Sequence, residues 1–460
     1  MTVGRVEHER IPDDVLELCR RLWEAGFEAH LVGGGVRDLL LRRPVHDWDV
    51  ATSAQPAEVQ GLFKRTVPVG IAHGTVAVVL RGGRQVEVTT YRGEGAYSDG
   101  RHPDSVTFVR TLEEDLQRRD LTINAMAIDP VRRELVDPMG GECDLHLRLI
   151  RAVGDPMERF AEDGLRTMRA VRFAAVLEFE VEEATRRGIG ASLESFRKVS
   201  RERVREELLK LLAAPRPSVG VELMRETGLI AEVLPELSAA RGVSQNRYHL
   251  EDVYTHSLRV CDLVPPGDAI LRLAALLHDV GKPTTVAPHP DRPGESTFHG
   301  HEKVGEELCR GVARRLRLSN EQSDRLCHLV RHHNFALEGW RAAGLRRFAR
   351  RVGPDHLEDL RALRAADLRG RDGPDQLPLL EAMWSRLEEV LRAQPALSAR
   401  QLAVDGNRIM SHLGIPPGPR VGQIIRQLLE RVLDDPTLNT EERLLEIADE
   451  IEREGEESSS

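Results

Sequence analysis

The chain contains 460 residues, 40% of them apolar, and has a formal net charge of −10. This length exceeds what one hydrophobic core usually supports, so we expect roughly three or four helix-rich domains. No apolar run is long enough to span a bilayer, and residues 1–14 lack a signal-peptide core, which predicts a cytoplasmic protein without a membrane partner. The cysteines show no Cys-X-X-Cys spacing, which argues against a disulfide framework or a zinc knuckle. We expect reduced thiols, mostly in cores, at Cys19, Cys143, Cys261, Cys309 and Cys327.

The negative net charge counts mildly against a nucleic-acid partner, because binding phosphates requires a local basic surface. Nearly all of the 65 basic residues are arginine, since lysine occurs only at positions 64, 198, 210, 282 and 303. The arginine fork suits phosphates and base edges. A GC-rich genome that replaces lysine throughout explains most of this bias, so only clustered arginines carry weight.

Mixed helix and strand signals occupy residues 28–150. Alternating apolar residues predict strands at 75–80 and 85–91, a proline after Ser53 predicts a helix start, and residues 121–128 form another apolar segment. From about residue 150 helical periodicity dominates, with breaks near 215–217, 244–248, 370–374 and 393–395. We therefore expect an α+β fold, with a small N-terminal mixed sheet and helices followed by all-α domains. The predicted boundaries are 1–150, 151–243, 244–372 and 373–452, with a disordered acidic tail at 453–460.

A glycine turn followed by two carboxylates is the most informative local feature. Residues 30–32 end an apolar strand, and Gly33 and Gly34, the first of three glycines, allow a tight turn into a helix. Backbone N–H groups of this turn could cradle a triphosphate. Asp47 and Asp49 alternate in a strand-like run, so we expect both side chains on one face. Paired carboxylates of this kind suit Mg²⁺.

Glu87, at an alternating position in residues 85–92, is the candidate third ligand. A two-metal transfer reaction, in which one cation activates a hydroxyl and the other holds phosphates, needs no side-chain nucleophile. Taken singly, a glycine triplet is a plain turn, an Asp-X-Asp pair is usually a solvated loop, and such a glutamate often faces solvent. The order and spacing together favour a metal-dependent nucleotidyl transferase.

Arginines recur beside apolar residues at 118–127 and 160–173. Two arginines, at 118 and 119, precede a buried-looking run, as expected if a guanidinium must be held rigidly at a polyphosphate or a base. In the second segment Asp163 is followed, at spacings of three that share a helix face, by Arg166, Arg169 and Arg172. An Asp/Arg pair can read a nucleobase edge without a template. An ordinary helix N-terminus with solvated arginines explains this segment equally well.

Several ordered motifs resemble the class II tRNA nucleotidyltransferase and poly(A) polymerase family, in particular its bacterial CCA-adding members with an attached HD domain. They lie at residues 32–38, 47–49, 70–75, 87–92, 118–125 and 162–166. The resemblance implies that Gly34 and Arg37 contact the incoming CTP or ATP and that Asp47 and Asp49 bind Mg²⁺. It also implies that further residues select and hold the nucleotide: Arg119, Asp163, Arg166, Arg169 and Arg172.

Two more segments resemble parts of this family. A mobile loop that switches specificity from C to A is matched in position by residues 92–107. Enzymes that add only CC resemble versions with this loop shortened, so its presence here favours incorporation of A. Residues 406–422 resemble the C-terminal body of longer members, which implies a platform for the tRNA elbow; from the residues alone, only a Gly/Pro-rich turn opening an amphipathic helix is evident.

The helical half contains an ordered set of ligand types: His256, His278, Asp279, His301, then His332 or His333, and finally Asp367. One stray histidine is usually a packed or surface residue, whereas an ordered set is less easily explained by chance. His278 and Asp279 end an apolar run, and burial there favours ligands over solvated residues.

This region resembles the HD superfamily of metal-dependent phosphohydrolases. His256, His278, Asp279 and Asp367 match its four-ligand pattern, and His301 is a possible addition. The resemblance implies phosphatase or 2′,3′-cyclic phosphodiesterase activity that uses a metal-activated water. Such domains also persist as scaffolds, and the ligands accept several divalent transition metals.

The leading hypothesis is template-independent addition of C, C and A to tRNA 3′ ends from CTP and ATP. The rival within the class is a poly(A) polymerase or an enzyme that adds only A. A rival from another class is an HD phosphohydrolase whose N-terminal half merely binds RNA, although the three carboxylates argue against a retired transferase site. The sequence leaves the oligomeric state open. It predicts an arginine-lined surface from the sheet along residues 166–172 towards the C-terminal helices.

Overall fold

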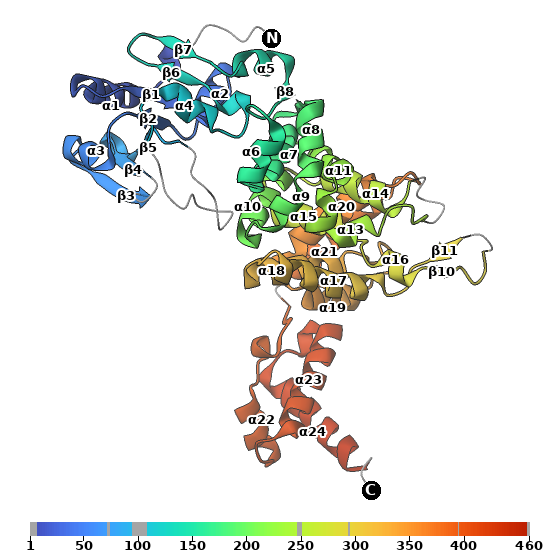
Figure 1. Ribbon diagram of the computed structural model, residues 1–460. Helices are drawn as coiled ribbons and strands as arrows, with labels where there is room; N and C mark the ends of the chain where they lie inside the picture. The colour runs from blue at the N-terminus through green and yellow to red at the C-terminus, as the bar shows by residue number, and fades with distance from the viewer. Residues whose placement is uncertain are drawn as a thin grey trace. The chain divides into compact units, whose positions relative to one another are not determined.

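The structure is a computed structural model that describes residues 7–70, 74–93, 108–245, 251–292, 295–393 and 395–457. The α+β class is confirmed, because a mixed sheet occupies the N-terminal part and the part after it is mostly helical (Figure 1). The described residues form two compact units. The first contains the residues up to Ser238 and two later segments, Pro266–Ala269 and Val312–Leu318, and the other residues form the second.

The seven-stranded sheet of the first unit has the strand order β3-β4-β5-β2-β1-β6-β7. Its strands are β1 Ala29–Val32, β2 Asp49–Thr52, β3 Thr66–Gly70, β4 Thr75–Val79, β5 Gln85–Thr90, β6 Ala127–Asp129 and β7 Glu134–Val136. Neighbouring strands are antiparallel except β2 and β5, which run parallel. Val86 and Val88 are fully buried, whereas Glu87 between them is exposed, as the alternation of side chains along a strand requires. The two strands predicted at 75–80 and 85–91 are thus confirmed.

The helices around this sheet start at recognisable caps. Pro56 opens α3, and Thr111 caps α4 in a capping box with Glu114. The helical segments are η1 His8–Arg10, α1 Asp13–Glu24, α2 Gly34–Leu40, α3 Pro56–Leu62, η3 Arg81–Gly83, α4 Leu112–Gln117, η4 Thr122–Asn124 and α5 Gly141–Leu147.

A second group of helices in the first unit is arranged around α7, which contacts α10 and α11 and buries Met168 and Val171. Its elements are β8 Leu149–Ile150, α6 Pro156–Glu162, α7 Leu165–Leu177, β9 Glu180–Val181, α8 Glu183–Ala191, α9 Leu193–Arg197, α10 Arg201–Leu212, α11 Pro217–Thr227, α12 Leu229–Val233 and α13 Pro235–Ser238. Gly164 precedes α7, and a Cβ there would lie 2.4 Å from the Ser195 carbonyl oxygen. This close backbone approach therefore requires glycine.

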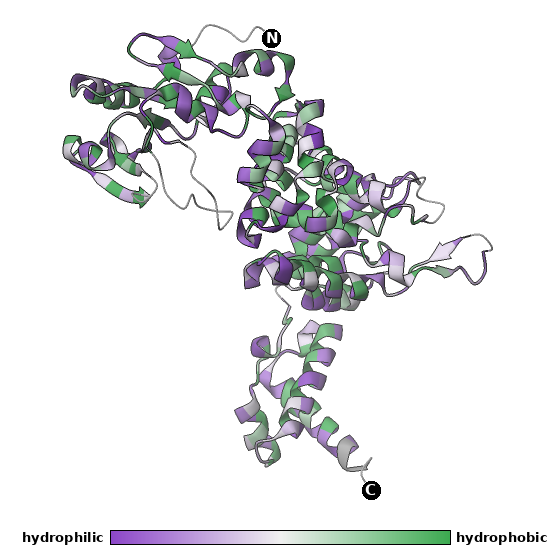
Figure 2. Cartoon of the chain, viewed as in Figure 1, coloured by the Kyte–Doolittle hydropathy of each residue, from purple (hydrophilic) through white to green (hydrophobic). Residues whose placement is uncertain are grey.

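The remaining elements are α14 Val253–Leu263, α15 Ala269–Leu277, α16 Lys282–Thr285, β10 Ala287–Pro288, β11 Ser296–Thr297, α17 His301–Arg315, α18 Asn320–His332, α19 Ala342–Val352, η5 Pro354–His356, α20 Leu357–Arg369, α21 Leu377–Arg392, η6 Ala399–Gln401, α22 Gly406–Leu413, α23 Pro419–Asp434, η7 Pro436–Leu438 and α24 Glu441–Glu457. Residues 270–277 of α15 are all buried. Most other helices mix apolar and polar residues along their length, as expected for amphipathic helices with one buried face (Figure 2). None of the helices within the described ranges is long and apolar enough to cross a membrane.

Helices α22 to α24 enclose an apolar core of their own, which includes Ile409, Ile424 and Leu444. Helix α19 is attached to α23 through Arg346, whose Nε donates to the Leu433 carbonyl oxygen over 2.6 Å. Because the last carbonyls of a helix lack partners within the helix, this arginine satisfies a group that would otherwise require water.

Two local predictions are corrected. Asp47 precedes β2 instead of lying in it, because β1 ends at Val32, which pairs with Asp49, and the chain then turns away at Gly33. Residues 453–457, assigned to a disordered tail, continue helix α24, since glutamate and arginine are good helix formers. All five cysteines are free, and only Cys143 is exposed.

Candidate active sites

The glycine turn between β1 and α2 lies directly against the carboxylates. Gly33 has a positive φ of 72°, and a Cβ on it would lie 3.1 Å from Arg119 Nη1 and 3.5 Å from Asp49 Oδ2. A Cβ on Gly35 would lie 3.1 Å from the Asp47 carbonyl oxygen. Glycine is therefore required in this turn for two reasons: the positive φ at Gly33, and the lack of space for a Cβ at Gly33 and Gly35. Gly34 begins α2, so its N–H is among those that helix hydrogen bonds leave free.

Asp49 and Glu87 are register partners on the parallel strands β2 and β5. Aligned residues of adjacent strands project to the same face, so the structure brings these two carboxylates together as predicted. Burial, and then the negative charges of Glu87 and Asp47, raise the pKa of Asp49 to about 6. This concentration of carboxylate oxygens fits a divalent cation such as Mg²⁺, which would relieve their repulsion. The carboxylate oxygens of Asp47, Asp49 and Glu87 lie farther apart than the ligand atoms of the cluster formed by His278, Asp279 and His333.

Arg119 is held beside the turn by Asp115, a buried residue of α4. Its Nη2 donates to Asp115 Oδ2 over 3.1 Å, and Arg118 donates to Oδ1 over 2.8 Å. Burial alone would raise the pKa of Asp115, but the two arginines outweigh it and hold the pKa below its ordinary value. Arg118 and Arg119 are thus both held by the carboxylate of Asp115, a residue for which the sequence predicted no role.

Arg37 on α2 is almost fully buried and has three polar contacts. Asp38 accepts from its Nε and Nη2 over 3.0 and 2.9 Å, and Asn124 Oδ1 accepts from Nη1 over 2.7 Å. The guanidinium also lies 4.8 Å from the ring centre of Phe173 on α7. Arg37 is therefore immobilised between α2, η4 and α7.

Phe173 brings three predicted arginines together. The guanidinium carbons of Arg172, Arg37 and Arg169 lie 3.8, 4.8 and 5.8 Å from the centre of its ring. Cation–π attraction stabilises such an arrangement and offsets part of the repulsion between the cations. Phe173 ends the arginine-containing segment 160–173, but the sequence alone gives it no role, because its effect depends on the fold around α7.

Each arginine of α7 is also paired with an acid. Arg169 Nε donates to Asp120 Oδ2 over 2.7 Å, and Arg172 forms a 2.6 Å ion pair with Glu207. Neither acid is predictable from the local sequence, since they lie 49 and 35 residues away from their partners along the chain. The side chains of Arg166 and Arg172 are thus anchored and mostly buried, whereas that of Arg169 is anchored but 35% exposed. The arginine-lined surface along residues 166–172 stays a prediction.

Asp163 lies just before α7 instead of on it, and both of its oxygens accept from Arg203, over 3.2 and 2.7 Å. Arg166 is buried and donates to Glu162 over 2.6 Å and to the Arg118 carbonyl oxygen over 3.1 Å. The side chains of Asp163 and Arg166 therefore have separate partners, and the two residues are joined through the backbone, where the Arg166 N–H donates to the Asp163 carbonyl oxygen over 3.0 Å. The switch loop predicted at 92–107 lies, from residue 94 onward, outside the described residues.

A second candidate site lies in the helical second unit, where all four predicted HD ligands meet. His256 Nε2 is 3.2 Å from Asp367 Oδ1, and His278 Nε2 is 3.1 Å from Asp279 Oδ2 and 3.8 Å from the same Asp367 oxygen. All four side chains are at most 3% exposed. Such a donor set in a dry environment fits a divalent transition metal.

His301 and His333 complete this cluster. Their Nε2 atoms lie 3.3 and 3.6 Å from Asp279 Oδ1, and 3.3 Å from each other. His332, the alternative to His333, stacks against His328 instead, with ring centres 4.5 Å apart. Burial lowers the pKa of His333 to about 4, so this imidazole is neutral at pH 7.

The imidazoles of the cluster are oriented by backbone carbonyls. Nδ1 of His278, His301 and His333 each hydrogen bonds a carbonyl oxygen over 2.7 Å, those of Ala275, Phe298 and Val330 respectively. Since a carbonyl only accepts, each ring carries a proton on Nδ1 and directs its Nε2 to the centre. This is the tautomer that a metal ligand requires.

Cationic side chains surround the two aspartates of the cluster. Lys282 Nζ lies 2.6 Å from Asp279 Oδ2, and Arg364 and Arg371 donate to Asp367 Oδ2 over 2.7 and 2.6 Å. Despite burial, His278 and then Lys282 hold the pKa of Asp279 well below the ordinary value, and Arg371, His256 and Arg364 do the same for Asp367. Sequence analysis did not identify them, although Lys282 stands three residues after Asp279.

Comparison with known proteins identifies the domains in which the two candidate sites lie. Residues 29–151 match the family of poly A polymerase head domains, 178–241 the family described as the probable RNA- and SrmB-binding site of polymerase A, and 247–369 the HD domain. The CCA-adding enzyme of Streptococcus gordonii is 35% identical over 421 residues, which cover 92% of this chain and 93% of that protein. That of Anoxybacillus flavithermus is 36% identical over 437 residues, covering 94% and 96%.

A solved structure extends this similarity to three dimensions. The crystal structure of the Bacillus stearothermophilus CCA-adding enzyme in complex with CTP aligns with a TM-score of 0.76 at 30% identity, covering 97% of this chain and 98% of that one. The chain therefore belongs to the bacterial CCA-adding enzymes, class II tRNA nucleotidyltransferases with a poly(A) polymerase head, an RNA-binding region and an HD domain.

Proposed function

We propose that this protein adds C, C and A to the 3′ ends of tRNA, using CTP and ATP. The observation that carries the proposal is the meeting of Asp49, Glu87 and Arg119 at the glycine turn of a poly(A) polymerase head. Carboxylates for a divalent cation and a fixed guanidinium for phosphates are the parts that nucleotidyl transfer needs. The relatives named CCA-adding enzymes span nearly the whole chain, which supports the same activity here.

In this proposal Asp47, Asp49 and Glu87 hold Mg²⁺ in a two-metal arrangement. When bound, Mg²⁺ would lower the pKa of the attacking RNA hydroxyl and balance the charge of the triphosphate. The N–H groups of Gly33 and Gly34, together with Arg119, hold the phosphates. Because no protein nucleophile is needed, the side chains act by binding and orientation.

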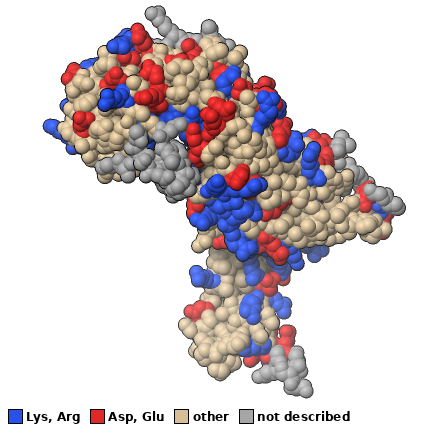
Figure 3. Space-filling view, viewed as in Figure 1, with Lys and Arg blue, Asp and Glu red and all other residues tan. Residues whose placement is uncertain are grey.

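Base selection is assigned to the α7 side of the site. Arg37, Arg169 and Arg172 form a fixed cationic wall around Phe173 that holds the nucleotide. Asp163 and Arg166 then read the edge of cytosine or adenine, with Asp163 exchanging Arg203 for the base. Helices α22 to α24 are proposed to bind the tRNA elbow. The visible face of the protein carries one dense group of Lys and Arg side chains (Figure 3), a feature suited to phosphates.

The test is nucleotide incorporation with Mg²⁺ and labelled CTP or ATP. Transcripts of one tRNA ending at the discriminator base, at C, at CC and at CCA serve as acceptors. The proposal expects each transcript to be completed to CCA and extension to stop there. Addition of A only to CC ends would establish the A-adding alternative, and long A tails would establish a poly(A) polymerase.

A second function is proposed for the HD domain, namely hydrolysis of phosphate monoesters or 2′,3′-cyclic phosphates at RNA ends. It is favoured by the cluster of four histidines and two aspartates, in which the imidazole Nε2 atoms lie close to the carboxylate oxygens. A divalent transition metal, when bound there, would activate water. Hydrolysis of 2′,3′-cyclic AMP should depend on added Ni²⁺, Mn²⁺ or Co²⁺ and disappear on chelation. Hydrolysis without nucleotide incorporation would instead favour a phosphohydrolase with an RNA-binding N-terminal half.

A further inference from the structure

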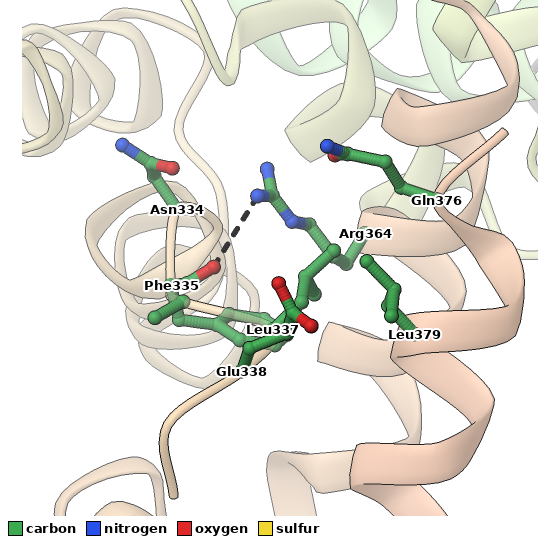
Figure 4. A pocket seen from close by; sticks show the side chains of 8 residues that line it. Asn334, Phe335, Leu337, Glu338, Arg364, Gln376 and Leu379 are labelled. Atoms are coloured by element: carbon green, nitrogen blue, oxygen red, sulfur yellow. Dashed lines mark hydrogen bonds between the residues drawn. The ribbon is translucent and has the colours of Figure 1, made fainter. Parts of the chain in front are cut away.

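A polar pocket adjoins the histidine–aspartate cluster of the HD domain. Its lining includes Asn334, Phe335, Glu338, Arg364, Gln376 and Leu379, and its volume is about 400 Å³ (Figure 4). Pockets of this size are typical of small-molecule sites. Two lining residues join it to the cluster, since Asn334 follows His333 and Arg364 donates to Asp367 over 2.7 Å.

Some N–H donors of the Arg364 guanidinium have no acceptor among the residues that the structure describes. Its side chain is 6% exposed, Nη1 donates to Asp367, and Nη2 donates to the Phe335 carbonyl oxygen over 3.3 Å. Nε has no hydrogen-bond partner among the described residues. A guanidinium has five N–H donors, so a buried one with two contacts is poorly satisfied unless a ligand or water completes it. Figure 4 shows this guanidinium pointing between Asn334 and Gln376.

We propose that Arg364 binds the phosphate of the HD-domain substrate and that the pocket holds the attached nucleoside. The inference rests on the proposed HD function and assigns the residues that would hold the phosphate and the nucleoside of its substrate. Because one guanidinium contacts Asp367 on one side and lines the pocket on the other, a phosphate on its free donors lies beside the cluster.

Other lining groups narrow the ligand class. The Gln376 amide offers donors and an acceptor, as a base edge or a ribose requires, and Asn334, whose Nδ2 donates to Glu302 over 2.8 Å, offers its oxygen as an acceptor. Glu338 also lines the pocket, and its negative charge disfavours a polyphosphate chain running along the wall. The pocket therefore suits the single phosphate of a damaged RNA end better than a nucleoside triphosphate.

The proposal is tested by calorimetric binding of adenosine 2′-monophosphate and of inorganic phosphate to the full chain. Leu379→Trp fills the pocket without touching the cluster, and Ser385→Trp places the same ring on an exposed position of the same helix, α21. We expect Leu379→Trp to weaken nucleotide binding by at least about tenfold while phosphate binding persists, and Ser385→Trp to change neither. Unchanged nucleotide affinity in Leu379→Trp would overturn the assignment of the pocket.

Arg364→Lys tests the phosphate contact, since it keeps the charge but loses the fork. It should weaken the binding of both ligands by about tenfold with unchanged metal content, and wild-type affinities would overturn the role of Arg364. CCA addition by each variant verifies folding. Nucleotide binding can be measured without turnover, so the two proposals fail separately. If the wild-type protein binds the nucleotide but does not hydrolyse cyclic phosphates, the proposed HD reaction is contradicted. If the wild-type protein hydrolyses them and Leu379→Trp binds the nucleotide as tightly as wild type, only the pocket assignment is contradicted.

Discussion

The aromatic ring of Phe173 contacts three of the predicted nucleotide-binding arginines. In Phe173→Leu the cation–π contacts to Arg37, Arg169 and Arg172 are lost, each worth about 0.5–1 kcal/mol. Each arginine keeps its acidic partner but loses the ring that positions it, so we expect KM for CTP and ATP to rise about tenfold. Steady-state kinetics measure this. Phe179→Leu is the control, because Phe179 is similarly buried but contacts Arg148. An equal rise in KM in both variants would show a general loss of packing.

Asp115 connects the nucleotide site to acid stability. Its folded pKa lies below the ordinary value of about 3.9, so its pairs with Arg118 and Arg119 stabilise the fold above that pH and are lost as pH falls through the folded pKa. Asp115→Asn should lower the stability of the first unit by about 2 kcal/mol at pH 7. The difference from wild type should shrink below about pH 4 in thermal melts.

The control for this pH dependence is Asp14→Asn, whose partner Arg84 is exposed. It should change stability by less than about 1 kcal/mol. A difference between Asp115→Asn and wild type that stays constant down to pH 2 would show that the ion pairs contribute nothing.

Local periodicity explains which site residues could be predicted. Asp49 and Glu87 each stand in an alternating strand pattern, and their meeting requires only that the two strands be neighbours. The choice between His332 and His333 depends on which of two adjacent residues at the end of α18 faces α17, which packing decides. Asp115, Asp120 and Glu207 carry no local signal, because their partners become neighbours only after folding.

At the scale of elements, Gly281 fixes the approach of the chain after α15 to the start of α17. A Cβ on it would lie 2.2 Å from the His301 carbonyl oxygen and 2.8 Å from the Gly305 nitrogen. Gly281→Ala must push His301 away from Asp279, so we expect loss of HD metal binding and a destabilisation of about 1–3 kcal/mol. Metal content and thermal melts measure both effects.

Gly311→Ala provides the matched control within α17, since a Cβ there meets nothing within 4 Å. It should stabilise the helix by about 0.5–1 kcal/mol and leave metal binding unchanged. Metal loss in this variant as well would mean that any change in α17 disturbs the cluster.

The strands of the sheet were predictable because alternation is a local property of the sequence. The end of a strand depends on its neighbour, which is why Asp47 was placed within β2 although β1 offers it no partner. The final helix differs in the opposite direction, because it extends farther than the sequence predicted. The composition of residues 453–457 suggested disorder, but a helix that began at Glu441 simply continues through them.

For the whole molecule, the two candidate sites belong to separate compact units and should fail independently. Asp49→Asn should reduce CCA addition by at least about a hundredfold, since metal charge stabilisation is worth several kcal/mol, and leave cyclic phosphate hydrolysis intact. Asp279→Asn should do the reverse. Incorporation and hydrolysis assays on both variants measure this, and a loss of both activities in either one would contradict independent sites.

The first unit includes two segments from the second half of the chain, Pro266–Ala269 and Val312–Leu318. Arg315, in the later of them, donates to Glu236 over 2.8 and 2.6 Å, and Arg317 pairs with Glu202. A shortened gene that stops after Ser238 would therefore encode a transferase half with unpaired acids and an incomplete surface. The HD region cannot be removed by a single truncation without also removing part of the first unit, so separating the two units by evolution or by engineering would require the lost residues to be replaced.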